Sequence, residues 1–216
     1  NCLIRILMRR LYGRVSSINV QKVAWTLEEI GLEFEWVDKN GTVSSIDSPN
    51  YRKFNPAAQI PTFDDNGTLL RQSNAIVRYL AHSYPESKLY PTEPEACAEA
   101  ERWMEWQATD LWNALRPVFW GLIRIKPKHR DLNFICKNIK ICHRETLLLN
   151  DFLSDRSFIA GDKFSMGDIP AGCAIYRYYA LPEEFMKWPD LPNLKAWLNR
   201  LSKRKGFRDF IMLPLV

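Results

Sequence analysis

The feature that most constrains this 216-residue chain is a single change of hydrophobic pattern, which falls in the segment 85–94. Before this segment, short apolar stretches typical of strands alternate with stretches typical of helices. After it, the apolar residues recur at the three- and four-residue steps of helices. Three prolines stand within the segment, and proline fits neither a helix interior nor a central strand. We therefore expect two domains, at 1–84 and 95–216, joined by a linker at 85–94.

The first domain should be an α/β layer. A strand within 4–12 and another at 34–37 are separated by a helical stripe, which consists of Val20, Val23, Ala24, Leu27 and Ile30. Gly31 follows the stripe, where a helix end favours a left-handed residue. Because a helix connects the two strands, they should lie parallel in a right-handed crossover.

The rest of this domain should complete a mixed four-stranded sheet. A short helix is expected to begin after the cap residue Ser48. Strands at 61–64 and 68–70 flank the pair Asn66-Gly67. This pair favours a two-residue hairpin turn because both residues tolerate positive φ.

The second domain should be entirely helical. Helices are expected over five stretches, which are 95–122, 132–154, 166–181, 194–203 and a short one after Gly206. Pro117 lies inside the first stretch and should kink it. Ser165 and Asp168 have the spacing of a capping box, with Asp in place of the usual Glu. We interpret this pair as a structural motif that starts a core helix, and not as a catalytic Ser-Asp pair.

The composition argues against several classes of protein. The net charge of +5 is spread along the chain, whereas a nucleic-acid-binding protein more often concentrates its basic residues in a tail or on one face. No apolar run reaches the roughly 18–20 residues that span a membrane. The five cysteines are odd in number and lack CxxC spacing, so neither a disulfide framework nor a metal site is expected. These features favour a reduced, cytoplasmic protein.

Two short segments, at 59–62 and 70–76, predict a small pocket. They read QIPT and LRQSNAI, and only the predicted hairpin separates them. The first contains the bond between Ile60 and Pro61, which would ordinarily be trans. A cis bond would instead turn the N–H and C=O of Ile60 outward, where they could pair with an extended peptide.

Gln72 and Ser73 open the helix that follows the hairpin, and two interpretations fit them. Ser73 is a common N-cap residue, so plain helix capping explains it. Alternatively, the free N–H groups and the positive end of the helix dipole bind a carboxylate. The Gln72 side chain could then accept from an ammonium group and donate to the carboxylate.

Ser16 and Ser17 stand at the mouth of the first helix, where capping again explains them. Alternatively, one hydroxyl points outward from the end of the first strand, where ligands gather in open α/β sheets. No His or Lys stands in this turn to act as a base, so a serine nucleophile is not expected. A hydroxyl that donates to a bound thiolate would contribute roughly 1.5–3 kcal/mol. The thiol pKa would fall by about 1–2 units, which favours the reactive thiolate.

Five longer motifs follow one another along nearly the whole chain, namely GRVSSINVQKVAWTLEEIGLEFE, NPAAQIPTFDDNG, QSNAIVRYL, FSMGDI and LPNLKAWLNRLSKRKGFR. In content, order and spacing they resemble the cytosolic glutathione S-transferases, in particular the serine-type, theta- and phi-like classes. The resemblance implies a thioredoxin-like α/β N-terminal domain and an all-α C-terminal domain. It also implies a transferase that joins the glutathione thiolate to a small electrophile.

The resemblance also assigns site residues. The glutathione contacts that it implies are Gln59, Ile60, Pro61, Gln72 and Ser73, with Lys53 and Asn55 as weaker candidates. Pro61 would be the family's cis-proline. Ser17 best matches the family's hydroxyl that stabilises the thiolate. Ser16 is the alternative, because a shift of one residue in the match to this turn would select it. Tyr12 precedes the turn and is expected to be strand core, and Cys2 comes too early to be a nucleophile.

In the family, the first long helix of the second domain lines the electrophile site. Here Trp112, Arg116 and Phe119 recur at three- and four-residue steps, so they should share a face. A stripe of the domain core explains this spacing as well. The resemblance adds the interpretation that these three residues contact the electrophile.

Glutathione would act as a co-substrate without a metal, and the resemblance implies a homodimer. Two other functions stay open. One is another glutathione-dependent enzyme on this fold, such as an isomerase, a dehalogenase or a peroxidase. The other is a non-catalytic binding protein that retains the fold. The electrophile is not specified by these residues.

Overall fold

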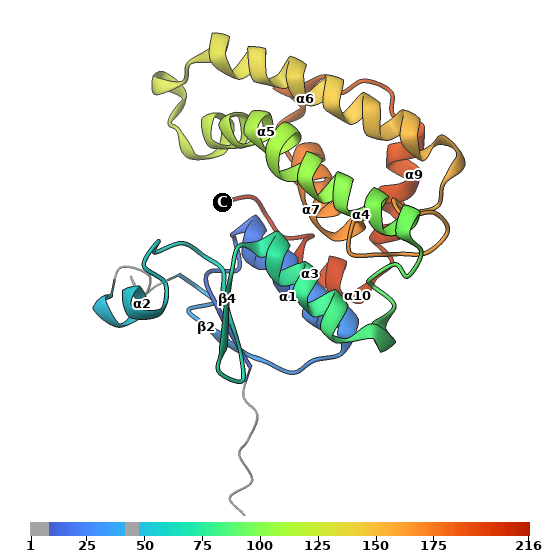
Figure 1. Cartoon of the computed structure of the whole chain (residues 1–216). Helices are drawn as coiled ribbons and strands as arrows, with labels where there is room; N and C mark the ends of the chain where they lie inside the picture. The colour runs from blue at the N-terminus through green and yellow to red at the C-terminus, as the bar shows by residue number, and fades with distance from the viewer. Residues whose placement is uncertain (1–8, 42–47) are drawn as a thin grey trace, which may run out of the picture. The chain divides into compact units, whose positions relative to one another are not determined.

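The computed structural model describes residues 9–41 and 48–216, which divide into two compact units (Figure 1). Unit 1 ends at Ser87 and unit 2 begins at Lys88. The beginning of the expected first strand, together with Cys2, lies outside the described residues.

Unit 1 contains a mixed four-stranded sheet in the order β2-β1-β3-β4. Its strands are β1 (Arg10–Tyr12), β2 (Glu35–Val37), β3 (Thr62–Asp65) and β4 (Thr68–Arg71). β1 pairs in parallel with β2, where Leu11 lies opposite Trp36, and antiparallel with β3, where Leu11 lies opposite Phe63. The mixed sheet and its parallel pair confirm what the strand–helix–strand pattern predicts.

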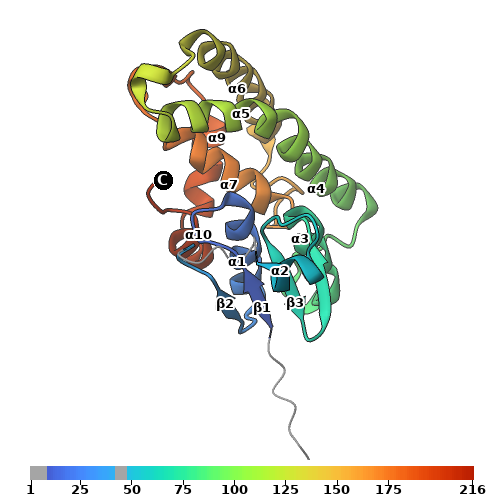
Figure 2. The same ribbon diagram turned by 90° about the vertical axis from the view of Figure 1, so that its left-hand side faces the viewer.

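Helices cover both faces of this sheet. The helices α1 (Ile18–Ile30) and α3 (Ser73–Ser83) pack against each other on one face, and α2 (Pro49–Phe54) lies on the other (Figures 1 and 2). Val20, Val23 and Leu27 of the predicted stripe are fully buried. Gly31 ends α1 with a left-handed φ of 76°. These features follow from the helical spacing of the stripe and from the freedom of glycine at positive φ.

The local signals around α2 and the hairpin are also confirmed. The Ser48 side chain accepts a hydrogen bond from the Tyr51 backbone N–H and so caps α2. Asn66 and Gly67 have φ values of 55° and 102° and form the two-residue turn between β3 and β4. The prediction that Ser73 is the N-cap of α3 is wrong. Gln72 takes the non-helical backbone of the cap, and Ser73 is already the first helical residue.

Unit 2 is helical in its described residues. Its α-helices are α4 (Pro94–Trp106), α5 (Trp112–Phe119), α6 (Leu132–Phe152), α7 (Asp168–Tyr179), α8 (Glu183–Met186), α9 (Pro192–Leu201) and α10 (Lys205–Phe210). Within this unit α7 lies among α4, α5 and α9, and most of its residues are buried (Figure 2). The short α8 was not predicted, because four residues leave no periodic pattern.

The expectation of one helix over 95–122 is wrong in detail. Two π-helical turns, at Gln107–Leu111 and Trp120–Arg124, flank α5. Pro117 lies inside α5 and has no N–H to donate to the preceding turn. π-Turns widen the helix and shift the phase of its side chains, so a strict 3.6-residue repeat does not hold across this region.

The start of α7 has the structural role that the Ser-Asp spacing predicts. The fully buried Asp168 carboxylate accepts hydrogen bonds from the backbone N–H groups of Ser165 and Ile159, at 2.9 and 3.0 Å, and from the Trp197 indole at 2.8 Å. In a complete capping box the Ser165 hydroxyl would accept a hydrogen bond from the N–H of Asp168. Here the hydroxyl accepts from the N–H of Gly167, so only the half of the box made by the Asp168 carboxylate is formed. Burial raises the pKa of Asp168 to about 6.

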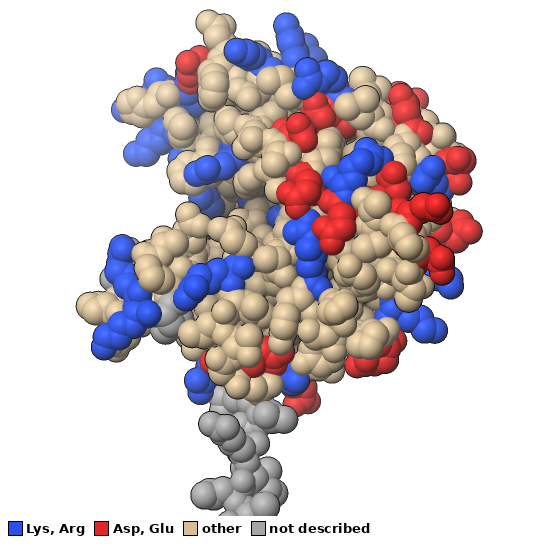
Figure 3. Space-filling model, in the orientation of Figure 1, with Lys and Arg blue, Asp and Glu red and all other residues tan. Residues whose placement is uncertain are grey.

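On the face drawn in Figure 3, Lys and Arg side chains lie in several separate groups, with Asp and Glu side chains between them on unit 2. No helix in the described ranges, 9–41 and 48–216, is long and apolar enough to cross a membrane.

Candidate functional site

The two segments that predict a pocket come together in unit 1. A pocket of about 70 Å³ is lined by Asn19, Asn55, Ala57, Gln59, Ile60, Pro61, Arg71, Gln72 and Ser73. The entrance of β3 forms one side of it, and the N-terminus of α3 forms another. Lys53 does not line this pocket and is exposed on α2.

The bond between Ile60 and Pro61 is cis, as the resemblance implies. Ile60 precedes β3, and its backbone N–H and C=O have no hydrogen-bond partner in the described parts of the chain. Gly13 approaches it closely, because a Cβ atom on Gly13 would lie only 2.9 Å from the Cβ of Ile60. The φ of Gly13, +131°, also favours glycine. The turn after β1 therefore lies directly beside the open backbone of Ile60.

The loop that carries Gln59 and Ile60 is held from within by Asn55. Its Nδ2 donates to the backbone oxygen of Gln59 at 2.7 Å and to Oγ1 of Thr62 at 2.9 Å. The Tyr51 hydroxyl donates to the same Gln59 oxygen at 2.8 Å. The Oδ1 of Asn55 is buried and has no hydrogen-bond partner in the described structure. Since Asn55 lines the pocket, this oxygen can accept an N–H from a ligand.

Gln72 has an unusual backbone for a residue with a side chain, with φ 68° and ψ 111°. Such conformations cost about 1–3 kcal/mol and cluster at ligand sites. The Gln72 side chain is exposed, and the hydroxyl of Ser73 lies 3.2 Å from Oδ1 of Asn19. The side chain of Gln72, the N-cap residue, makes no capping hydrogen bond to the first turn of α3. This helix N-terminus is therefore open to a carboxylate in the pocket.

Ser17 is the N-cap residue of α1 by its backbone, with φ −81° and ψ 119°, but its side chain makes no capping hydrogen bond. Plain capping therefore does not account for its hydroxyl. Ser16 lies in the preceding turn, and both serines are half-buried. Neither lines the 70 Å³ pocket, whereas Asn19 in the first turn of α1 does.

The turn that carries these serines is fixed by β2. The N–H of Gly13 donates to the oxygen of Val37 at 3.1 Å, and the N–H of Val15 donates to Lys39 at 2.8 Å. The Trp36 indole donates to the oxygen of Gly13 at 2.7 Å. The turn thus has a defined position relative to the sheet. A serine hydroxyl on this turn can therefore be held at one place, as is needed for a hydrogen bond to a single ligand atom.

Two lining residues, Asn19 and Arg71, were not predicted as site residues. Arg71 directly precedes Gln72, so the sequence position alone could have suggested it. Asn19 belongs to α1 and accepts a hydrogen bond from Ser73, which lies 54 positions further along the chain. No local sequence pattern reveals such a contact.

In unit 2, the three predicted electrophile contacts differ in their surroundings. Phe119 is buried and Trp112 is half-buried, and the Arg177 guanidinium lies 4.5 and 6.0 Å from their ring centroids. Arg116 is exposed and lies over the Trp120 ring at 5.6 Å. Arg177 comes from α7, so the spacing within α5 could not have indicated it. Burial lowers the pKa of Arg177 to about 10, which leaves it charged at neutral pH.

Comparisons with known proteins agree with this arrangement. Residues 9–82 match the family described as Glutathione S-transferase, N-terminal domain, and residues 147–200 match Glutathione S-transferase, C-terminal domain. Glutathione S-transferase GstB of Escherichia coli K12 is 35% identical over 210 residues, which cover 96% of this chain and 100% of GstB. The chain belongs to the glutathione S-transferase family.

Relatives of this glutathione S-transferase occur in bacteria and in plants. The probable glutathione S-transferase GSTF1 of Oryza sativa is 30% identical, over 95% of this chain and 97% of the rice protein. A solved theta-class glutathione S-transferase from Xanthomonas axonopodis pv. citri, with glutathione bound, is 34% identical with a TM-score of 0.90. The similarity covers 98% of this chain and 100% of that structure. The thioredoxin-like unit and the helical unit are thus those of the family.

Proposed function

We propose that this glutathione transferase binds glutathione in the unit 1 pocket and transfers its thiolate to a small electrophile. The observation that carries the proposal is the meeting of two features in one pocket. The open backbone of Ile60 suits an extended peptide, and the uncapped N-terminus of α3 at Ser73 suits a carboxylate. Glutathione has both features, a short peptide backbone and a free carboxylate at each end.

Individual side chains then have distinct roles toward the tripeptide. Gln72 accepts from the γ-glutamyl ammonium and donates to its carboxylate, beside Ser73. Asn55 offers its buried Oδ1 to a peptide N–H. Arg71 lines the same pocket and adds a positive charge for a carboxylate. Lys53 stays a weaker proposal because it lies outside the lining.

Ser17 donates a hydrogen bond to the glutathione sulfur and stabilises it as the thiolate. Support comes from its place in the fixed turn beside Ile60 and from a hydroxyl that does not cap α1. Ser16 is the alternative donor. The protein forms no covalent bond to the substrate in this scheme, and it contributes thiolate stabilisation and proximity.

The electrophile is proposed to contact Trp112, Arg116 and Phe119 in unit 2. The half-buried Trp112 ring offers apolar surface and Arg116 offers a charge at an exposed position, whereas Phe119 is buried. We further propose that the enzyme acts as a cytoplasmic homodimer without a metal cofactor. The family resemblance supports the dimer, and the odd number of cysteines supports the compartment.

Calorimetry with glutathione tests the pocket. Gln72→Ala should weaken binding by roughly 10- to 100-fold, because two charge-assisted hydrogen bonds are lost. Lys137→Ala, at an exposed position of α6 in unit 2, is the control and should bind as the wild type does. Normal binding by Gln72→Ala would contradict the proposed site.

The same preparation separates the alternative functions. The transferase should conjugate 1-chloro-2,4-dinitrobenzene or another electrophile from an acceptor panel. Glutathione binding with turnover only of isomerase, dehalogenase or peroxidase substrates would favour another enzyme on this fold. No binding at millimolar glutathione would favour a non-catalytic protein.

A further inference from the structure

Three arginine residues of unit 2 gather around the aromatic residues of α5 and of the π-turn that follows it. They are Arg116 on α5, Arg124 at the end of the π-turn and Arg177 on α7. Only Arg116 is among the proposed electrophile contacts, and the proposed reaction gives the other two no role. We call these three residues the arginine cluster. Their charges bear on the kind of electrophile that this part of unit 2 accepts.

The guanidinium groups of the arginine cluster alternate with aromatic rings. Arg116 and Arg124 lie over the Trp120 ring, at 5.6 and 4.9 Å from its centroid. Arg124 also lies 5.0 Å from the centroid of Phe119, and Arg177 lies 4.5 Å from the same centroid. Guanidinium groups are attracted to the faces of aromatic rings in this way. Phe119 and Trp120 thus each contact two cations, which brings the three charges together.

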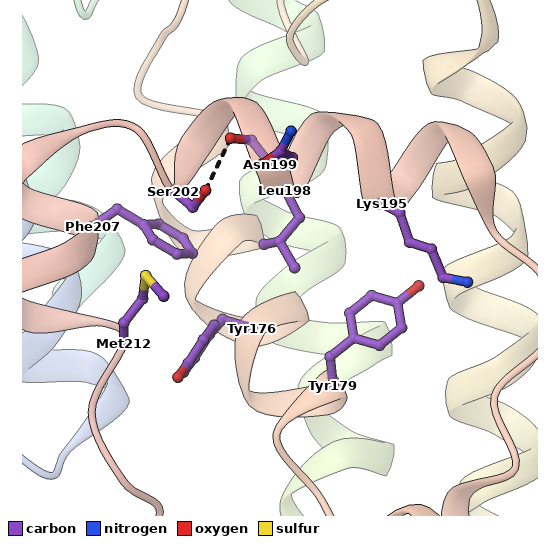
Figure 4. Close-up of a pocket in the computed structure, with 8 residues that line it drawn as sticks. All are labelled: Tyr176, Tyr179, Lys195, Leu198, Asn199, Ser202, Phe207 and Met212. Carbon is purple, nitrogen blue, oxygen red and sulfur yellow. Dashed lines mark hydrogen bonds between the residues drawn. The ribbon is translucent and has the colours of Figure 1, made fainter.

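The position of Arg177 on α7 directs its side chain towards α5. Tyr176 and Tyr179 of the same helix line a separate pocket of about 290 Å³ on the side of α9 (Figure 4). Successive side chains of a helix point about 100° apart, so Arg177 can face α5, which packs against α7. Burial lowers the pKa of Arg177, and the nearby charge of Arg124 adds to this effect. The two cations therefore repel each other, and an anion bound beside them would relieve the repulsion.

The chain around the arginine cluster is basic, and Arg124 already contacts an oxygen acceptor. Residues 111–130 contain five Lys or Arg and no Asp or Glu. The exposed Arg124 donates from Nε and Nη2 to the backbone oxygen of Val216, at 3.3 and 3.1 Å. Val216 is 63% exposed, so an anion can replace its oxygen. A carboxylate accepts from the same two nitrogen atoms of an arginine and adds the attraction of its charge.

We propose that the arginine cluster selects an electrophile that carries a carboxylate group, an inference that rests on the transferase function proposed above. The carboxylate meets the exposed guanidinium groups of Arg116 and Arg124. The apolar part of the electrophile lies against the exposed ring of Trp120 and the half-buried ring of Trp112. Arg177 is buried and acts as a positioning residue, which adds positive potential from the protein interior, where charges are screened less than in water.

Two electrophiles that differ in one charge test this selection. They are 4-chloro-3,5-dinitrobenzoate and its neutral amide, 4-chloro-3,5-dinitrobenzamide. In both, the glutathione sulfur bonds to the ring carbon, chloride leaves with the electron pair of the C–Cl bond, and the thiol proton passes to solvent. Each kcat/KM of the full chain is divided by the rate constant of the uncatalysed reaction with glutathione, because the two rings differ in intrinsic reactivity.

We expect the normalised kcat/KM to be roughly tenfold higher for the carboxylate than for the amide. Because salt screens exposed charges, this ratio should fall as sodium chloride is raised from about 50 to 500 mM. Equal normalised values for the two electrophiles in an active wild type would overturn the proposal and leave the transferase function standing. A chain that conjugates neither of them, nor 1-chloro-2,4-dinitrobenzene, would overturn both.

Substitutions assign the selection to individual residues. Arg116→Gln and Arg124→Gln should each lower the ratio of carboxylate to amide by roughly three- to tenfold. Arg177→Met should lower it by roughly threefold, and Arg177→Lys should restore most of it, whereas a merely structural role would slow both electrophiles alike. Arg124 is exposed, so its variant tests the proposal even if Arg177→Met does not fold.

Lys126→Gln is the matched control, because it removes the same charge from an exposed position of the same basic stretch. Its ratio should stay within about twofold of the wild type, since long-range effects of exposed charges are screened. A ratio that falls as far in Lys126→Gln as in Arg124→Gln would reflect net charge and overturn the proposal. A wild-type ratio in both Arg116→Gln and Arg124→Gln would overturn it as well.

Discussion

At Gln72 the backbone conformation opposes stability, whereas the side chain is proposed to bind glutathione. Its φ of 68° is unfavourable for any residue with a Cβ atom, and yet its side chain is the one proposed to meet both charges of the γ-glutamyl group. A glycine there would relax the backbone and lose the side chain. Backbone strain of this kind persists only where the surrounding structure fixes it, and ligand sites are common places for it.

Gln72→Gly should therefore separate the two effects. We expect the free energy of unfolding of unit 1 to rise by roughly 0.5–1 kcal/mol, because the positive φ is relieved. Glutathione binding should fall at least about tenfold, as for Gln72→Ala. Lys187, which has φ 42° in unit 2, supplies a control, since Lys187→Gly should leave binding unchanged. Urea unfolding and calorimetry measure the two quantities, and a Gln72→Gly variant with full affinity would contradict the role of the side chain.

At the scale of elements, the loop between α2 and β3 depends on Asn55. Asn55→Ala leaves the Gln59 oxygen and the Thr62 hydroxyl without this donor. We expect a loss of about 1–3 kcal/mol in the free energy of unfolding, together with a higher KM for glutathione. Urea titration and steady-state kinetics check both. A stable variant with an unchanged KM would show that the loop holds its shape without Asn55.

The start of α7 predicts a pH dependence of stability. The pKa of Asp168 is raised from its ordinary 3.8 to about 6 in the folded protein, so the folded state holds the proton more tightly. The stabilising contribution is fully present below pH 4 and is lost as the pH rises through 6. Relative to Asp168→Asn, the wild type should lose roughly 1 kcal/mol between pH 5 and pH 7.5. Parallel stability curves for the two proteins, measured by urea unfolding, would contradict this assignment.

The elements that the sequence predicts well are those set by local rules. The Asn66-Gly67 turn, the Ser48 cap and the left-handed Gly31 depend only on residues close in the chain, and all three are present. The π-turns around α5 are different, because they depend on how the helix packs and no local residue pattern marks them. The N-cap of α3 lies one residue before the serine that the sequence predicts, because tertiary structure also determines where this helix begins. The sequence favours serine as a cap, but the backbone turns at Gln72.

The same distinction applies to the candidate site. Two short motifs predict Gln59, Ile60, Pro61, Gln72 and Ser73 as site residues, and these five residues line one pocket. The motifs do not predict Asn19 or Arg177, because each contacts its partners from a helix that is distant in the sequence. Contacts of this kind depend on tertiary packing, which a single sequence does not express.

At the scale of the whole molecule, the proposed homodimer predicts a definite mass. A chain of 25.3 kDa should sediment at about twice that mass at micromolar concentration. Sedimentation velocity over a hundredfold range of concentration measures it. A species that remains at the mass of one chain throughout would contradict the dimer, without bearing on the glutathione pocket within unit 1.

The pKa of the bound glutathione thiol tests the central claim most directly. Thiolate absorbance near 240 nm, followed against pH for enzyme-bound glutathione, reports this pKa for the wild type, Ser17→Ala and Ser16→Ala. We predict a thiol pKa about 1–2 units below that of free glutathione in the wild type and in Ser16→Ala, and a return towards the free value in Ser17→Ala. Loss of the effect in Ser16→Ala alone would move the role to Ser16. An unperturbed thiol pKa in the wild type would contradict thiolate stabilisation by this turn altogether.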